Sequence, residues 1–190
     1  MKIAFTVLLL SACLTCAVAQ TGTPSSAPAA TNPPAATKDP VTASLRILLP
    51  RSRNNILGAI SAMPADKFNY KPTPDQITFA HLAVHIVNSN RLLCSKAADV
   101  EAPKVDELKE TDSKDKMVAA ATASFDFCNE ALGKMDDSKL GDSVDIFGRG
   151  QMPRAVAALA LASGWADHYS AAAQYLRLNG ILPPSAQPKK

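Results

Sequence analysis

The chain has 190 residues, which is enough for one domain with appended segments. Its formal net charge is +3, and the Lys and Arg residues are interleaved with Asp and Glu instead of forming a basic stripe with aromatic residues. Nucleic-acid-binding domains carry such a stripe, so we expect no nucleic-acid partner.

The first 19 residues have the pattern of a cleaved secretory signal peptide. Lys2 supplies the positive start, residues 3–10 are apolar apart from one threonine, and residues 17–19 (Ala-Val-Ala) form a cleavage site. The apolar stretch is short for a membrane span, and no stop-transfer segment follows it, so we expect no transmembrane anchor. The mature chain is predicted to begin at Gln20, in the periplasm or outside the cell.

A second interpretation of the same segment remains open. Leu-Ser-Ala-Cys at residues 10–13 resembles a lipoprotein signal, whose cleavage would leave a lipidated Cys13 at the start of the mature protein. The residues after Cys13 stay apolar and the signal would be short, so this is the alternative to cleavage before Gln20.

Two segments lack the large apolar side chains that a folded core requires. Residues 20–40 consist largely of Pro, Ala, Thr and Ser, and residues 185–190 have a similar polar and Pro-containing composition. Such segments cannot bury enough surface to offset the entropy of ordering, so both are predicted to be disordered. The folded domain is then expected over residues 41–184.

The domain is predicted to be an all-α, four-helix bundle. Apolar residues recur at helical spacing over residues 41–62, 76–98, 113–133 and 152–179. The long connections after the second and third helices allow a crossover in place of a simple up-and-down order.

Local signals mark the expected ends of these helices. Thr73 or Asp75 is the candidate N-cap of the second helix, and Pro153 falls in the first turn of the fourth, where its missing N–H is harmless. Gly180 is placed to end the fourth helix in the left-handed conformation. Between the third and fourth helices, residues 144–147 favour a short extended piece.

Loss of the signal peptide would leave two cysteines, Cys94 and Cys128. In an oxidising compartment a lone pair of cysteines most often forms a disulfide, and we predict one here. The alternative is a pair of buried free thiols.

The chemistry of the domain is concentrated in three histidines. His81 and His85 lie four residues apart on one side of the second predicted helix, with His85 at the border of the apolar face and His81 closer to solvent. His168 shares an apolar face of the last helix and is expected to point inward. Neutral imidazoles on facing helices are typical metal ligands, whereas the alternative is a hydrogen-bonded core histidine.

Several segments together resemble the DinB-like superfamily across residues 41–184. The first connection and second helix carry the resemblance, together with the cysteine near Phe125 and the end of the last helix. The matching segments are residues 63–74, 78–86, 89–94, 125–128, 167–170 and 175–184. The resemblance implies a four-helix bundle, often dimeric, that holds a divalent metal such as zinc or nickel through three histidines.

The ligand set implied by this resemblance is incomplete in this chain. The second-helix ligand corresponds to His85, and the second ligand of the last-helix pair corresponds to His168. The first ligand of that pair falls on Gly164, which has no side chain. His81 is the candidate substitute, one turn from His85.

Three functions are therefore weighed. The first is a non-catalytic module that binds a small molecule or a protein. The second is a metal-dependent hydrolase or transferase that uses His85 and His168 with a substitute third ligand, as the resemblance implies for some relatives. The third is a lipid-anchored structural protein of the envelope.

Overall fold

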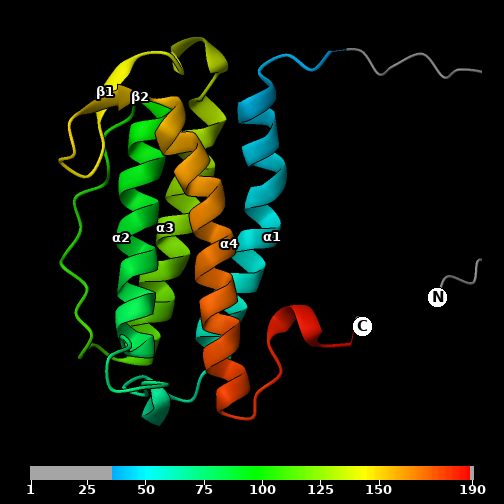
Figure 1. Ribbon diagram of the computed structural model, residues 1–190, viewed down its shortest axis with the longest axis vertical. Coiled ribbons are helices and arrows are strands. Elements are labelled where there is room, and N and C mark those ends of the chain that lie inside the picture. Colours follow the sequence, from blue (N-terminus) through cyan, green and yellow to red (C-terminus); the bar gives the residue numbers. More distant parts are fainter. Residues whose placement is uncertain (1–35, 189–190) are drawn as a thin grey trace, which may run out of the picture. The chain divides into compact units, whose positions relative to one another are not determined.

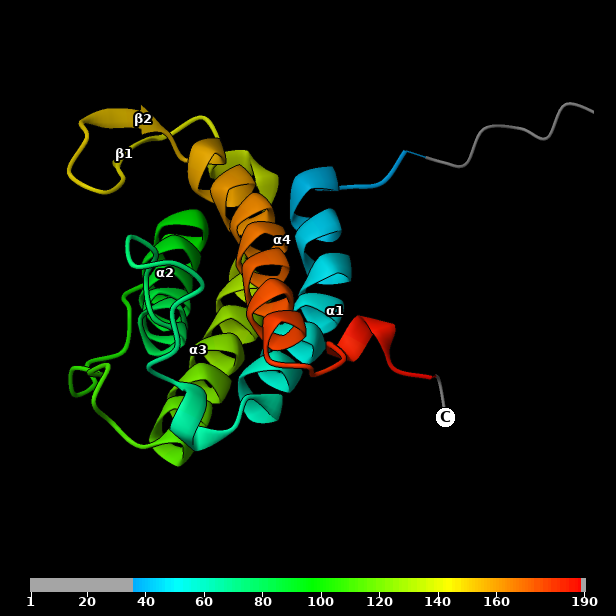
Figure 2. The ribbon, with the colours of Figure 1, turned by 60° about the horizontal axis from the view of Figure 1, so that its bottom comes forward.

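The structure, a computed structural model, describes residues 36–188, and four helices lie side by side in it as a bundle (Figures 1 and 2). This confirms the predicted all-α four-helix fold. The predicted signal peptide, Cys13 and most of the predicted linker lie outside the described residues. The helices are α1 (Pro40–Ala62), α2 (Phe79–Ala98), α3 (Lys114–Lys134) and α4 (Ala155–Leu178).

The helices do not follow one another around the bundle. Helix α2 packs against α3 and α4, and α1 packs against the same two helices, so α1 and α2 lie on a diagonal. Asn90 and Cys94 of α2 contact Ser124 and Cys128 of α3 in the same chain order, so these two helices run parallel. The connection between them, residues 99–113, must therefore return along the length of the bundle, as Figure 1 shows.

The start of α2 corrects one prediction. Thr78, not Thr73 or Asp75, is the N-cap, and its hydroxyl accepts a hydrogen bond from the backbone N–H of His81 at 2.9 Å. The prolines before it favour turns over a helical start, so the helix begins at residue 79 instead of 76. Helix α3 begins as expected after Ser113, whose hydroxyl accepts from the N–H of Lys116.

The start of α4 also differs from the prediction. Residues 152 and 153 were expected in its first turn, but they belong to β2 (Gln151–Pro153), which pairs antiparallel with β1 (Ser143–Asp145). Pro153 takes the last position of this short ladder, opposite Ser143, where its missing N–H is tolerated. The extended piece expected at residues 144–147 is realised only in part: β1 starts one residue earlier and ends at Asp145, and Phe147 has a positive φ of 62°.

The chain beyond α4 folds back onto α1. Gly180 has the left-handed φ of 74° predicted for the residue after the helix. Pro184–Ala186 then form a 3-10 turn, so the structure continues past the boundary expected at residue 184. This turn lies against Gly58 of α1, where an added Cβ would come within 2.8 Å of the Pro184 ring.

Apolar side chains from all four helices fill one continuous core. The largest fully buried ones include Phe79, Ile86, Phe125, Ile56 and Leu176. Among residues 36–188, no helix combines the length and hydrophobicity needed to span a membrane.

Candidate functional site

His85 of α2 and His168 of α4 meet at the interface of these two helices. Their ring centroids are 4.9 Å apart and the ring planes are nearly perpendicular, at 87°. The close packing of α2 on α4 brings them together from positions 83 residues apart in the sequence, and we call them the histidine pair. The two imidazoles expected to face each other therefore do so.

His168 is the inner member of the pair. Its Nδ1 atom is shielded from solvent and has no hydrogen-bond partner among the described residues. Burial, reinforced by the nearby His85, lowers the pKa of His168 to about 4, while the Asp167 carboxylate opposes the shift. The ring is therefore neutral at pH 7, and its buried Nδ1 forms no hydrogen bond among the described residues.

His85 is the outer member, and its side chain reaches the surface. Its Nε2 lies 3.3 Å from the hydroxyl of Ser89, one turn further along α2. Partial burial and then the charge of His81 lower the pKa of His85 below its usual value. Both members of the pair are therefore uncharged at neutral pH, which is the form that accepts a hydrogen bond or a metal ion.

Gly164 lies one turn before His168 on α4, at the position where the resemblance places a further histidine. A Cβ built on this glycine would lie 3.6 Å from Cε1 and 4.0 Å from Nδ1 of His168, an ordinary van der Waals distance. The His168 ring thus lies beside the bare backbone of Gly164. This position supplies space but no donor atom.

His81 forms a separate interaction at the start of α2. Its Nδ1 lies 2.8 Å from Oε1 of Glu110, and the hydroxyl of Thr78 donates to Oε2 of the same carboxylate at 2.8 Å. These hydrogen bonds lower the pKa of Glu110. The side chains of His81 and Glu110 are 49% and 43% exposed, so this pair ties the 99–113 connection to α2 at the surface.

The donor atoms present do not fit a three-ligand metal centre. Within residues 36–188 there is no group of three or more His, Cys, Asp or Glu side chains that could hold a metal ion. The histidine pair supplies two nitrogens, Gly164 supplies none, and His81 is engaged by Glu110. Zinc sites with open positions ordinarily have three protein ligands.

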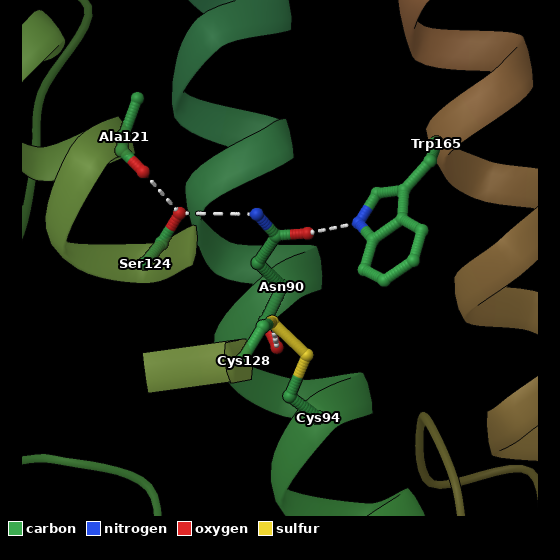
Figure 3. Close-up of a disulfide and its surroundings, with 6 residues drawn as sticks. All are labelled: Asn90, Cys94, Ala121, Ser124, Cys128 and Trp165. Atoms are coloured by element: carbon green, nitrogen blue, oxygen red, sulfur yellow. Dashed lines mark hydrogen bonds between the residues drawn. A yellow bond between two sulfur atoms is a disulfide. The ribbon is translucent and has the colours of Figure 1, made fainter. Parts of the chain in front are cut away.

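Asn90 is the polar residue whose role was not apparent from the sequence, where it falls within the apolar stripe of the second helix. It is 1% exposed, its amide nitrogen donates to Ser124 Oγ at 3.1 Å, and its amide oxygen accepts from Trp165 Nε1 at 2.9 Å (Figure 3). One buried amide therefore joins α2, α3 and α4 in the middle of the bundle. The signal available in the sequence was an asparagine at an apolar position of the second predicted helix, because a buried polar group needs hydrogen-bond partners.

The two cysteines lie next to this amide. Cys94 and Cys128 are at disulfide-bonding distance, with their Cα atoms 5.2 Å apart, and link α2 to α3 (Figure 3). The Trp165 indole is buried in the core, and the Tyr169 hydroxyl donates to Ser185 Oγ and accepts from the Ser185 backbone N–H.

Comparison with known proteins identifies the family of the chain. The DinB superfamily matches residues 48–171, which is more than half of the chain. No curated protein matches the sequence.

Two solved structures share the fold. A DinB-like protein from Bacillus cereus ATCC 10987 is similar at a TM-score of 0.61 and 17% identity, over 75% of this chain and 95% of that one. A DinB-like protein from Bacillus subtilis is similar at a TM-score of 0.61 and 17% identity, over 76% of this chain and 99% of the other. By the match of its sequence and the arrangement of its helices, the chain belongs to the DinB superfamily.

Proposed function

We propose that this chain is an exported DinB domain that acts as a binding module, and that the histidine pair is a reduced form of a three-histidine metal site. The observation that carries this proposal is Gly164, which leaves the third ligand position without a donor atom. His81, the candidate substitute, already binds Glu110 through Nδ1.

The energetics of coordination favour the same conclusion. A metal ion bound by two imidazoles has one protein ligand fewer than in a three-histidine site, so it is held less tightly. In addition, few hydrogen bonds orient either ring for coordination. His85 has only the Ser89 hydroxyl nearby, and Nδ1 of His168 has no partner. The neutral rings instead offer hydrogen-bonding atoms to an uncharged polar group of a ligand.

Restoring the missing donor tests the proposal. The wild-type protein is expected to retain only substoichiometric zinc or nickel after dialysis, whereas Gly164→His is expected to bind one equivalent. The added side chain lies one turn from His168, and the space beside the ring accommodates its Cβ. Gly133→His is the matched control, because a Cβ at this exposed glycine of α3 meets no atom within 4 Å.

The outcome that contradicts the proposal is equally concrete. A wild-type protein that holds one equivalent of zinc or nickel through dialysis and hydrolyses an ester or amide substrate would be an enzyme. An unchanged metal content in Gly164→His, with its fold intact by circular dichroism, would refute the reduced-site interpretation itself.

The second candidate function is a divalent-metal-dependent hydrolase or transferase that uses His85, His168 and a substitute third ligand. Two observations favour it: the unpartnered Nδ1 of His168, and the lowered pKa values that keep both rings neutral. For this function, His85→Ala and His168→Ala must each abolish metal retention. Wild-type protein without retained metal rules this function out.

Export and assembly are part of the proposal and have their own measurements. Mass spectrometry of the mature protein is expected to find Gln20 at its start, and acylation at Cys13 would instead make it a lipoprotein. A homodimer, which the family resemblance implies, is measured by light scattering.

A further inference from the structure

The long connection from α2 to α3 covers the groove between these two helices. Its middle part, residues 101–108, is called the strap here. No residue of the strap takes part in a backbone-to-backbone hydrogen bond. Its carbonyl at Pro103 accepts from Arg91 Nη2, and its one buried side chain is Leu108. The strap is therefore held by side chains, so it can move without breaking secondary structure.

A cavity of about 220 Å³ lies between the strap and the groove. Val87 of α2, Ala120 and Ala123 of α3, and Val105 and Leu108 of the strap give it a mainly apolar lining. This volume is somewhat below the roughly 300 Å³ at which pockets for drug-sized ligands begin, so its ligand must be small.

The cavity is separate from the histidine pair. At about 100° per residue, Val87 and Arg91 are separated from His85 by roughly 160° and 120° around α2, so they lie on a different face of the helix. His85 faces α4, whereas Val87 and Arg91 face α3 and the strap. A ligand in the cavity therefore uses none of the atoms on which the proposed function depends.

Arg91 is the polar side chain that gives the cavity its specificity. It lines the cavity, and among the described residues its guanidinium has one hydrogen-bond partner, the Pro103 carbonyl, and no ion-pair partner. Its Nε atom has no acceptor. The other cation of the lining, Lys116, is already paired with Asp112 at 2.8 Å. A carboxylate ligand would supply the acceptor that Arg91 lacks.

Asp106 also lines the cavity and is the one lining side chain that would attract a cationic ligand instead of an anionic one. Like Arg91, it forms no ion pair among the described residues. It belongs to the strap, whereas Arg91 belongs to a helix whose position is fixed by the Cys94–Cys128 link and the Asn90–Ser124 hydrogen bond. Because Arg91 is already held in place, an anionic ligand can pair with it at little cost in entropy. A cationic ligand would have to order the strap before it could pair with Asp106.

We propose that this cavity binds a small carboxylic acid with an apolar body, such as a medium-chain fatty acid. The apolar part lies between Val87, Ala120 and the strap, and the carboxylate pairs with Arg91. The proposal goes beyond the binding role proposed above by naming a ligand class, and it stands or falls independently of the histidine pair.

Three probes with the same eight-carbon body and different head groups test the proposal. The purified ¹⁵N-labelled protein is titrated with octanoate, octylamine and octanol, and amide shifts are followed by NMR. Octanoate is expected to shift amides of α2, α3 and the strap around residues 87–91, 103–108 and 120–124. It is expected to bind about tenfold or more tightly than the amine, because only the anion gains the charge-assisted hydrogen bond. Equal binding of octylamine, or shifts confined to α1 and α4, would overturn the proposal.

Two substitutions separate the head group from the cavity. Arg91→Gln is expected to weaken octanoate by about tenfold and leave octanol unchanged, while Arg51→Gln, at an exposed arginine of α1, changes neither. Ala123→Leu fills the cavity from its partly open wall and is expected to abolish binding of octanoate with unchanged thermal stability. Octanoate binding that survives Ala123→Leu, or that is insensitive to Arg91→Gln, contradicts the proposal.

Discussion

The buried amide of Asn90 should contribute strongly to stability, and a double-mutant cycle can isolate its bond to Trp165. Asn90→Leu removes the acceptor of the Trp165 N–H, which is 2% exposed, and the donor to Ser124. A buried unsatisfied donor costs about 1–3 kcal/mol and the lost Ser124 bond about 1 kcal/mol, so we expect a net destabilisation of about 2–4 kcal/mol. Ser124 keeps its bond to the Ala121 carbonyl and adds no further penalty.

The second half of the cycle is Trp165→Phe, which removes the donor and strands the Asn90 oxygen. Combining the two changes removes both partners at once, so the double variant is expected to be about 1–2 kcal/mol more stable than the sum of the single effects predicts. The assay is urea unfolding under non-reducing conditions, so that Cys94–Cys128 is the same in all four proteins. Strictly additive free energies of unfolding would refute the assignment of this hydrogen bond.

Three further predictions concern the histidines, the cysteines and the strap. The pKa of His168 falls from 6.5 in the unfolded chain to about 4 in the fold, so the unfolded state binds more protons. The free energy of unfolding is therefore expected to be highest above pH 6.5 and to decline as the pH falls toward 4. Urea unfolding of wild type and His168→Gln across this range checks this expectation. The same pH dependence of the free energy of unfolding in both proteins would contradict it. Non-reducing peptide mapping is expected to join Cys94 to Cys128, and reduction should lower stability by about 3–4 kcal/mol, since the link closes a separation of 34 residues. Two alkylatable thiols in the native protein would disprove this link. Glu110→Gln weakens the contact with His81, so amides of the 99–113 connection should exchange faster with deuterium while those of α1 do not; unchanged exchange would show that the contact does not hold the segment.

The sequence predicted the parts of this fold that local patterns control. Apolar periodicity located the four helices, and the glycine at position 180 ended the last one as expected. The errors lie at helix starts, where several residues could serve as cap. Thr73, Asp75 and Thr78 all have capping side chains; the prolines before Thr78 disfavour an earlier start, and the tertiary contact of Thr78 with Glu110 further distinguishes it.

The candidate site was predictable in part for the same physical reason. Helical spacing predicts that the side chain of His168 points inward. The packing of α2 on α4 then brings its ring against that of His85. The partner of His81 did not follow, because Glu110 lies 29 residues away on a connection with no periodic pattern. The hydrogen bonds of Asn90 have separations of 34 and 75 residues and depend on the crossover order of the helices.

The Cys94–Cys128 link makes the α2–α3 pair harder to separate than the other helix pairs of the bundle. Cys94–Cys128 fastens α2 to α3, while α1 and α4 are attached to them through side-chain packing and hydrogen bonds. Partial loosening would therefore displace α4 from α2 and separate the two imidazoles while leaving the walls beneath the strap in register. The cavity proposed to hold an apolar acid should therefore withstand partial unfolding better than the histidine pair does.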